Sequence, residues 1–106
     1  MELRRFSRVP IDRSVVFAQK GDDVFSDGLA TDISLGGMFI ATEFPATFGA
    51  EITVHVALSD DTPELVLPAI VRWTRPDGMG VQFQLIGARE TFAITEVVRL
   101  HEAASR

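Results

Sequence analysis

The sequence has no cysteine and no tyrosine, and it contains a single tryptophan. Without cysteine, neither a disulfide framework nor thiol chemistry is available, which fits a reducing cytoplasm. No stretch approaches the roughly 18 apolar residues of a membrane span, and the N-terminus lacks the apolar run of a signal peptide. We therefore expect a cytoplasmic protein with no membrane insertion.

Basic residues are few, with 10 Lys and Arg against 15 Asp and Glu, for a net charge of −5. The charge is uneven, because through residue 13 four arginines outnumber Glu2 and Asp12, giving +2, and the remainder therefore carries −7. Broad nucleic-acid binding needs an extended basic surface that displaces counterions from many phosphates. DNA and RNA are therefore not expected partners, whereas a small dianion needs only a local basic patch.

The length and the apolar pattern predict one mainly-β domain over residues 1–106. A hydrophobic content of 46% is sufficient for a single core. About six short segments separated by turn signals predict strands, and a small antiparallel barrel would remove their exposed edges. We predict a six-stranded antiparallel β-barrel over about residues 9–86 and a C-terminal α-helix over about 88–104.

The strand pattern also predicts which side chains face the core. The second strand is expected to run from about residue 24 to 34, with a break or bulge near Asp27-Gly28, and the faces of Met38–Ala41 are not assigned. The helix is expected to carry Glu90 in its first turn and Arg99 in its last. The positions predicted to face inward on the strands are Val9, Ile11, Val15, Phe17, Ile52, Val54, Val56, Leu58, Leu65, Leu67, Ala69, Val71, Trp73, Val81, Phe83 and Leu85. The apolar stripe predicted on the helix is Ala93, Val97, Leu100 and Ala104, with Ile94 and Val98 beside it.

One polar stretch, Asp32-Ile33-Ser34-Leu35-Gly36-Gly37, stands at a predicted strand end. If Ile33 points into the core, the period of two places Asp32 and Ser34 together on the opposite face. Gly36 and Gly37 follow, and glycine is favoured where a chain turns through positive φ or lets a ligand approach its amides. An ordinary strand end with an Asx-type turn is the alternative.

The N-terminus carries a second polar stretch, Arg4-Arg5-Phe6-Ser7-Arg8. Arg4 and Arg8 are four residues apart, so they share a side of either a strand or a helix. Guanidinium groups bind phosphate oxygens in pairs and stack on flat rings. The alternative is a solvated basic tail.

Together these two stretches resemble the signature of the PilZ domain, a bacterial receptor for the second messenger cyclic di-GMP. Arg4 and Arg8 match its Arg-x-x-x-Arg motif, and Asp32, Ser34 and Gly37 match its Asp-x-Ser-x-x-Gly motif. The resemblance also extends to the strand order, to Gly78–Phe83 and to the closing helix. It implies a ligand-binding receptor without a cofactor or an enzymatic activity.

The resemblance implies a role for each motif residue. Arg4 and Arg8 would grip the phosphates and stack on the guanines, with Arg5 as an auxiliary cation, and Asp32 would accept from the guanine N–H groups. Ser34 would meet a phosphate oxygen, while Gly36 and Gly37 would let the ligand approach. Residues 1–8 are expected to be a flexible basic segment that folds over the ligand.

Other candidate residues have plainer interpretations. Trp73 is either a core residue or a ring at a strand end that stacks on a base. His55 and His101 lack a nucleophile or second ligand at motif spacing, and the acidic turns at 22–23 and 60–64 lack the alternating ligands of a calcium loop. No catalytic or metal residue is therefore assigned.

Two further interpretations stay open. The same barrel can serve as a protein-interaction module in motility or surface regulation, because the PilZ family includes members that bind partners and not the nucleotide. An output signal in either case needs an unidentified protein partner. The helix stripe is apolar enough to pack on its own barrel or on a second copy, so a homodimer is the other alternative. An oligonucleotide-binding barrel is disfavoured by the acidic body and the scarcity of stacking aromatics.

Overall fold

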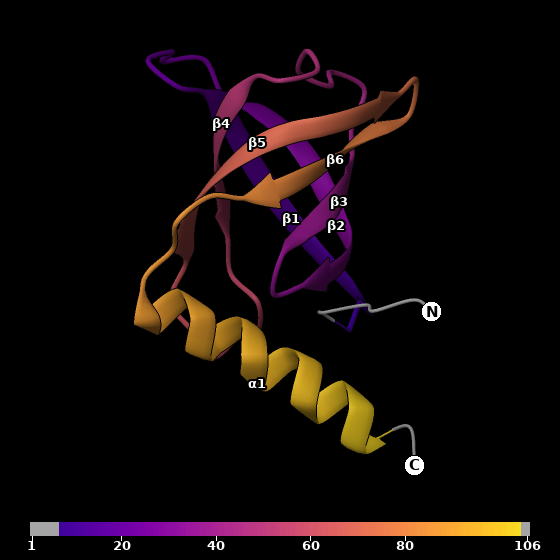
Figure 1. Cartoon of the computed structure of the whole chain (residues 1–106), viewed down its shortest axis with the longest axis vertical. Coiled ribbons are helices and arrows are strands. Elements are labelled where there is room, and N and C mark those ends of the chain that lie inside the picture. The colour runs from indigo at the N-terminus through magenta and orange to yellow at the C-terminus, as the bar shows by residue number, and fades with distance from the viewer. Residues whose placement is uncertain (1–6, 105–106) are drawn as a thin grey trace, which may run out of the picture.

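The structure, a computed structural model, describes residues 7–104 and consists of strands followed by one helix (Figure 1). All six strands precede the helix in the chain, and every pair of neighbours in the sheet is antiparallel. The elements are β1 (Val9–Gln19), β2 (Ser26–Ser34), β3 (Gly37–Ala41), β4 (Glu51–Val56), β5 (Leu65–Arg75), β6 (Gly78–Phe83) and α1 (Ala88–Ala104).

The six strands close into a barrel in the order β1-β2-β3-β6-β5-β4. Closure pairs β1 with both β2 and β4, so no edge of the sheet stays unpaired. Figure 1 shows α1 lying across one end of the barrel, beside the segment that joins β4 to β5. The predicted six-stranded antiparallel barrel with a C-terminal helix is confirmed, and none of the described helices has the length and apolar character needed to cross a membrane.

The barrel interior is filled by alternate side chains from all six strands, as the period of two requires. β4 illustrates the pattern, because Ile52, Val54 and Val56 are buried while His55 lies on the outer side. Ile94 is the buried residue of α1 and joins the same cluster. Most predicted core positions on the strands are confirmed, with two exceptions, Trp73 and Leu85.

Trp73 leaves the predicted core face because the pairing of β5 with β6 shifts between Val71 and Trp73. A bulge inserts one extra residue and so reverses the side to which the following side chains point. Val71 is buried, whereas 46% of Trp73 is exposed on the outside. Leu85 is exposed because β6 ends before it, at Phe83.

The predicted bulge near Asp27-Gly28 is also wrong. There β2 pairs regularly with β1, and the register shifts instead between Ala30 and Asp32, in the pairing with β3 and also in the pairing with β1. Ala30 and Ile33 are three positions apart, yet both are fully buried. The extra residue between Ala30 and Asp32 allows both Ala30 and Ile33 to face the core, and it places Asp32 on the outer side of the barrel.

The helix has the predicted bounds, and its buried side is the predicted one without its C-terminal end. Ile94 is its centre, and Ala93, Val97 and Val98 pack partly against the core. Leu100, predicted to lie in the stripe, is 57% exposed. Glu90 occupies the first turn as expected, but His101 and not Arg99 is the basic residue of the last turn.

Candidate functional site

Arg8 and Asp32 are brought together at one end of the barrel by the pairing of β1 with β2. Val9 is the first residue of β1 and pairs with Ile33, and Pro10 pairs with Asp32. Arg8 therefore enters beside Asp32, and its guanidinium Nη1 donates a hydrogen bond to Oδ1 of the carboxylate. The two side chains are 45% and 30% exposed, so this ion pair is accessible to a ligand.

Arg4 and Arg5, the other predicted cations of the site, lie outside the described residues. The described part of the predicted arginine motif is therefore Arg8 alone. Its pairing with Asp32 joins the two sequence motifs at one place.

Ser34 lies on the same side of β2 as Asp32, as the alternation predicts, because the pairing is regular from Asp32 to Ser34. Its side chain is nevertheless buried, with 4% of the residue exposed. The hydroxyl oxygen accepts a hydrogen bond of 3.1 Å from the amide of Gly36, and the hydroxyl lies 3.5 Å from the carbonyl oxygen of Gly37. In this state Ser34 organises the turn between β2 and β3.

Gly36 and Gly37 do not turn the chain through positive φ, contrary to one reason expected for them. Within residues 7–104, positive φ occurs at Gly21 and Gly49. Gly37 is needed for a packing reason, because a Cβ atom there would lie 2.0 Å from the carbonyl oxygen of Val81 on β6. Gly37 therefore allows β3 and β6 to approach each other closely.

The outer side of the sheet continues from Asp32 toward Trp73 in one row of paired residues. Asp32 pairs with Phe39, Phe39 with Gly80, and Gly80 with Trp73. Neighbouring strands are about 4.8 Å apart, so the row spans roughly 14 Å between its end backbones. The carboxylate and the indole, 41 positions apart in the sequence, therefore belong to one continuous surface.

Phe39, Trp73 and Arg75 form a stacked group on this surface. The rings of Phe39 and Trp73 lie 5.3 Å apart at an interplanar angle of 24°. The guanidinium of Arg75 lies 4.9 Å from the centre of each ring, within cation–π range. The indole is half-exposed and the guanidinium carries a positive charge, and these are the groups that stacking on a nucleobase and contact with a phosphate require.

Sequence reasoning missed Phe39 and Arg75. Phe39 belongs to a strand whose residues are all apolar or small, so alternation could not assign its side. Arg75 begins the stretch Arg75-Pro76-Asp77-Gly78, whose composition is typical of a turn and indicates no binding role. Gly80 is the residue that could have indicated this group, because the absence of a side chain there leaves room for the indole. Its meaning becomes clear only when the register of β3, β6 and β5 is known.

His55 and Asp60, two of the remaining candidates, make structural contacts in the described part of the chain. Nδ1 of His55 lies 3.5 Å from Oε1 of Glu64, and its ring meets Phe25 edge-on at 5.3 Å between centroids. Asp60 of the acidic turn lies 3.1 Å from Nη2 of Arg13. Within the described range, His and acidic side chains form no group of three that could hold a metal ion.

Comparisons with known proteins agree with this architecture. The family model described as PilZ domain matches residues 2–101. The solved PilZ domain of CeSA from a cellulose-synthesizing bacterium is 21% identical, with a TM-score of 0.73 over 91% of this chain and 98% of that one. The PilZ domain of YcgR from Escherichia coli, solved with c-di-GMP, is 13% identical, with a TM-score of 0.78 over 99% of this chain and 95% of that one.

A longer protein also contains this fold. The inhibitor of motility MotI/DgrA from Bacillus subtilis is 17% identical, with a TM-score of 0.83 over 100% of this chain and 54% of that one. The chain therefore spans about half of that protein. No curated protein matches the chain.

Proposed function

Because this chain belongs to the PilZ domain family, we propose that it is a receptor for cyclic di-GMP and binds the nucleotide without transforming it. The observation that carries the proposal is the Arg8–Asp32 pair, which unites the arginine motif with the acidic motif at an accessible edge of the barrel. The solved relative from E. coli that carries c-di-GMP has the same fold.

Asp32 and Arg8 supply complementary groups for the two parts of the ligand. Guanine presents two neighbouring N–H donors, and a carboxylate has lone pairs enough to accept both. Arg8 donates in a fork that fits phosphate oxygens. In the free chain the two groups neutralise each other, so the ligand must share or replace that ion pair when it binds.

Trp73 and Arg75 extend the site along the outer row. A guanine base can stack on the exposed indole face, and Arg75 adds a positive charge beside the phosphates. Ser34 contributes by holding the turn at Gly36 and Gly37, and a free lone pair of its hydroxyl remains for hydrogen bonding. The site therefore combines charge, hydrogen bonding and stacking.

The N-terminal arginines complete the proposed mechanism. Arg4 and Arg5 lie outside the described residues, and we assign them to the phosphates through the match of their motif. Binding would close residues 1–8 over the ligand, and a cytoplasmic protein partner would read that change as the output signal. Amide exchange tests this step, because protection near residues 4–9 should rise when cyclic di-GMP is added.

Calorimetric titration with cyclic di-GMP tests the proposed function. The Arg8→Ala and Asp32→Ala variants should each bind on the order of 10- to 100-fold more weakly, since each removes a charge-assisted hydrogen bond. Arg99→Ala is the matched control, because Arg99 is an exposed arginine on α1 whose partner is Glu96, and it should bind as the parent does.

A negative titration would also be informative. A ligand specific for the folded state raises the melting temperature by mass action. If cyclic di-GMP at tens of micromolar shifts neither the melting temperature nor any amide resonance, the receptor proposal fails. The alternative, a module for protein interaction in motility or surface regulation, then replaces it.

A further inference from the structure

An apolar groove of about 280 Å³ lies between α1 and the segment that joins β4 to β5. Positions 89, 92, 93, 96, 97 and 100 of α1 line it, and this spacing places them along one side of the helix. The opposite wall is made by Leu58, Pro63 and Leu65. Among the lining residues only Leu65 belongs to a strand, and it begins β5 eight positions before Trp73. The groove therefore lies away from the surface that carries Asp32 and Trp73.

The helix wall of the groove projects into solvent. Phe92 is 66% exposed and Leu100 is 57% exposed. A small molecule held between the walls would leave their outer sides uncovered, whereas a protein surface would bury both. Exposed apolar groups gathered beside a groove mark interaction surfaces. The occupant that fits is therefore a macromolecule.

One charge of each sign belongs to the two segments that form the groove, and neither has a partner among residues 7–104. Arg89 lines it from the helix side, and within residues 7–104 it is the one basic side chain for which the structure gives no hydrogen bond, ion pair or ring contact. Asp61 lies in the opposite wall segment, between groove residues Ser59 and Thr62, and it is exposed. Its carboxylate likewise has no ion pair to a described residue.

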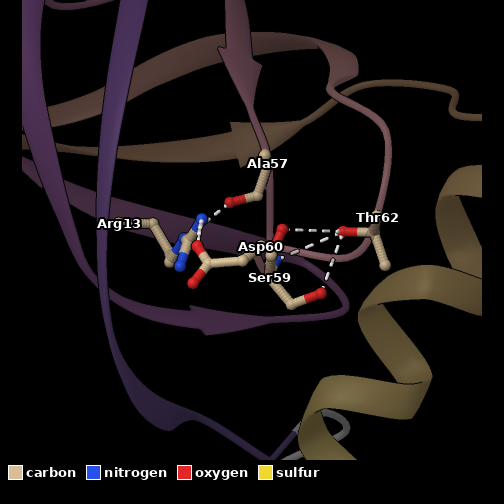
Figure 2. Close-up of polar contacts among 5 residues, drawn as sticks. All are labelled: Arg13, Ala57, Ser59, Asp60 and Thr62. Carbon is tan, nitrogen blue, oxygen red and sulfur yellow. Dashed lines mark hydrogen bonds and ion pairs between the residues drawn. The ribbon is translucent and has the colours of Figure 1, made fainter.

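The segment that carries Asp61 is held in place by its neighbours (Figure 2). The hydroxyl of Thr62 accepts from the amide of Ser59 and donates to its carbonyl, both at 3.2 Å. On the other side, Arg13 donates to the carbonyl of Ala57 at 2.7 Å and pairs with Asp60 at 3.1 Å. Asp61 therefore stands between two anchored residues.

Glu96 also lines the groove, but its charge is already satisfied. Nη2 of Arg99 donates to its Oε1 at 2.8 Å, and this hydrogen bond lowers the pKa of Glu96 below its usual value. Arg89 thus has no acidic partner among the described residues, and its exposed guanidinium is available to an acid of another molecule.

We propose that the groove is the contact surface for a second copy of this chain, related by a two-fold axis. In such a contact the same patch faces itself, so Arg89 of each copy meets the partner's Asp61. Phe92 of each copy then enters the partner's groove. The surface suits a second copy because it carries one unpaired charge of each sign on opposite flanks, and the two-fold operation pairs both at once.

Analytical ultracentrifugation of the whole chain over 5 µM to 500 µM, concentrations chosen about the affinity of weak dimers, should show a monomer–dimer equilibrium. Over the same dilution series, amide resonances should move at residues 58–65 and 89–100. Phe92→Ser should weaken dimerisation about tenfold or more, as expected of a central aromatic anchor. A chain that stays monomeric at the highest concentration overturns the proposal.

Charge reversal tests the geometry. Arg89→Glu and Asp61→Arg should each weaken self-association about tenfold, because each converts both ion pairs into repulsions. An equimolar mixture of the two variants should dimerise again, since both cross-pairs are then attractive, and this recovery also shows that each variant is folded. Asp23→Arg, a reversal in the distant β1–β2 turn, should behave as the parent.

Two outcomes besides a monomeric parent contradict the proposed surface. If Phe92→Ser dimerises as the parent does, the contact lies elsewhere on the surface. The same holds if the two charge-reversal variants have parent-like amide spectra but do not dimerise when mixed. Resonance changes confined to the Asp32 side of the barrel would do the same.

Discussion

The indole of Trp73 lies directly over Gly80, so closely that a Cβ atom on Gly80 would be 2.2 Å from Cε2 of the ring. The two residues pair across β5 and β6 just beyond the bulge that turns Trp73 outward. An exposed tryptophan is thereby held against the barrel in one orientation. A ring fixed in advance loses little further freedom when a base stacks on it.

Gly80→Ala should displace the indole. The added methyl overlaps the ring, and overpacking of this kind costs about 1–3 kcal/mol of unfolding free energy. Trp73 is the sole tryptophan, so its fluorescence emission reports the displacement directly. Gly87→Ala is the control, because a Cβ there meets only the flexible end of Glu90. Unchanged emission in Gly80→Ala would show that the contact with Gly80 does not hold the indole in place.

Trp73→Ala should weaken cyclic di-GMP binding about 5- to 100-fold, because base–aromatic stacking contributes about 1–3 kcal/mol. In the parent chain, binding should change the emission of Trp73. Phe48→Ala, which removes an exposed ring in the loop between β3 and β4, is the matched control. Equal affinities of Trp73→Ala and the parent by calorimetry would remove the indole from the site.

Arg8→Ala should change stability and affinity very differently. The Arg8–Asp32 pair is partly exposed to solvent, and exposed ion pairs contribute about 0–1 kcal/mol to stability. Chemical denaturation should therefore show a small loss while ligand affinity falls sharply. A large loss of stability with little change in affinity would indicate that the pair is a structural clamp.

Gly37→Ala should act on folding before it acts on the ligand. The new Cβ would collide with a backbone carbonyl of β6, which cannot move aside as a side chain can. We expect a loss of at least about 2 kcal/mol in unfolding free energy. A Gly37→Ala variant that is as stable as the parent but does not bind cyclic di-GMP would instead indicate that Gly37 is needed for the ligand to approach.

Much of the fold could be predicted from local pattern. The alternation in β4 identified the buried residues and the outward His55, and the change of period placed α1 at its observed bounds. The motifs around Asp32 and Arg8 could be read in the same way, because each needs only residue types at short spacing. These features depend on residues close together in the chain, so their pattern can be recognised without knowledge of the tertiary structure.

The tertiary structure alone decided which side chains share the outer surface. Single-residue bulges near Ala30 and Val71 reverse the direction of everything after them, and no residue pattern marks their positions. Pairing across strands then aligned Asp32, Phe39 and Trp73. The same pairing explains why positions 37 and 80 are glycine, since a Cβ atom at either would collide with a neighbouring strand or side chain. Residue types fixed the chemistry available, whereas strand register, which depends on residues far apart in the chain, determined where that chemistry meets.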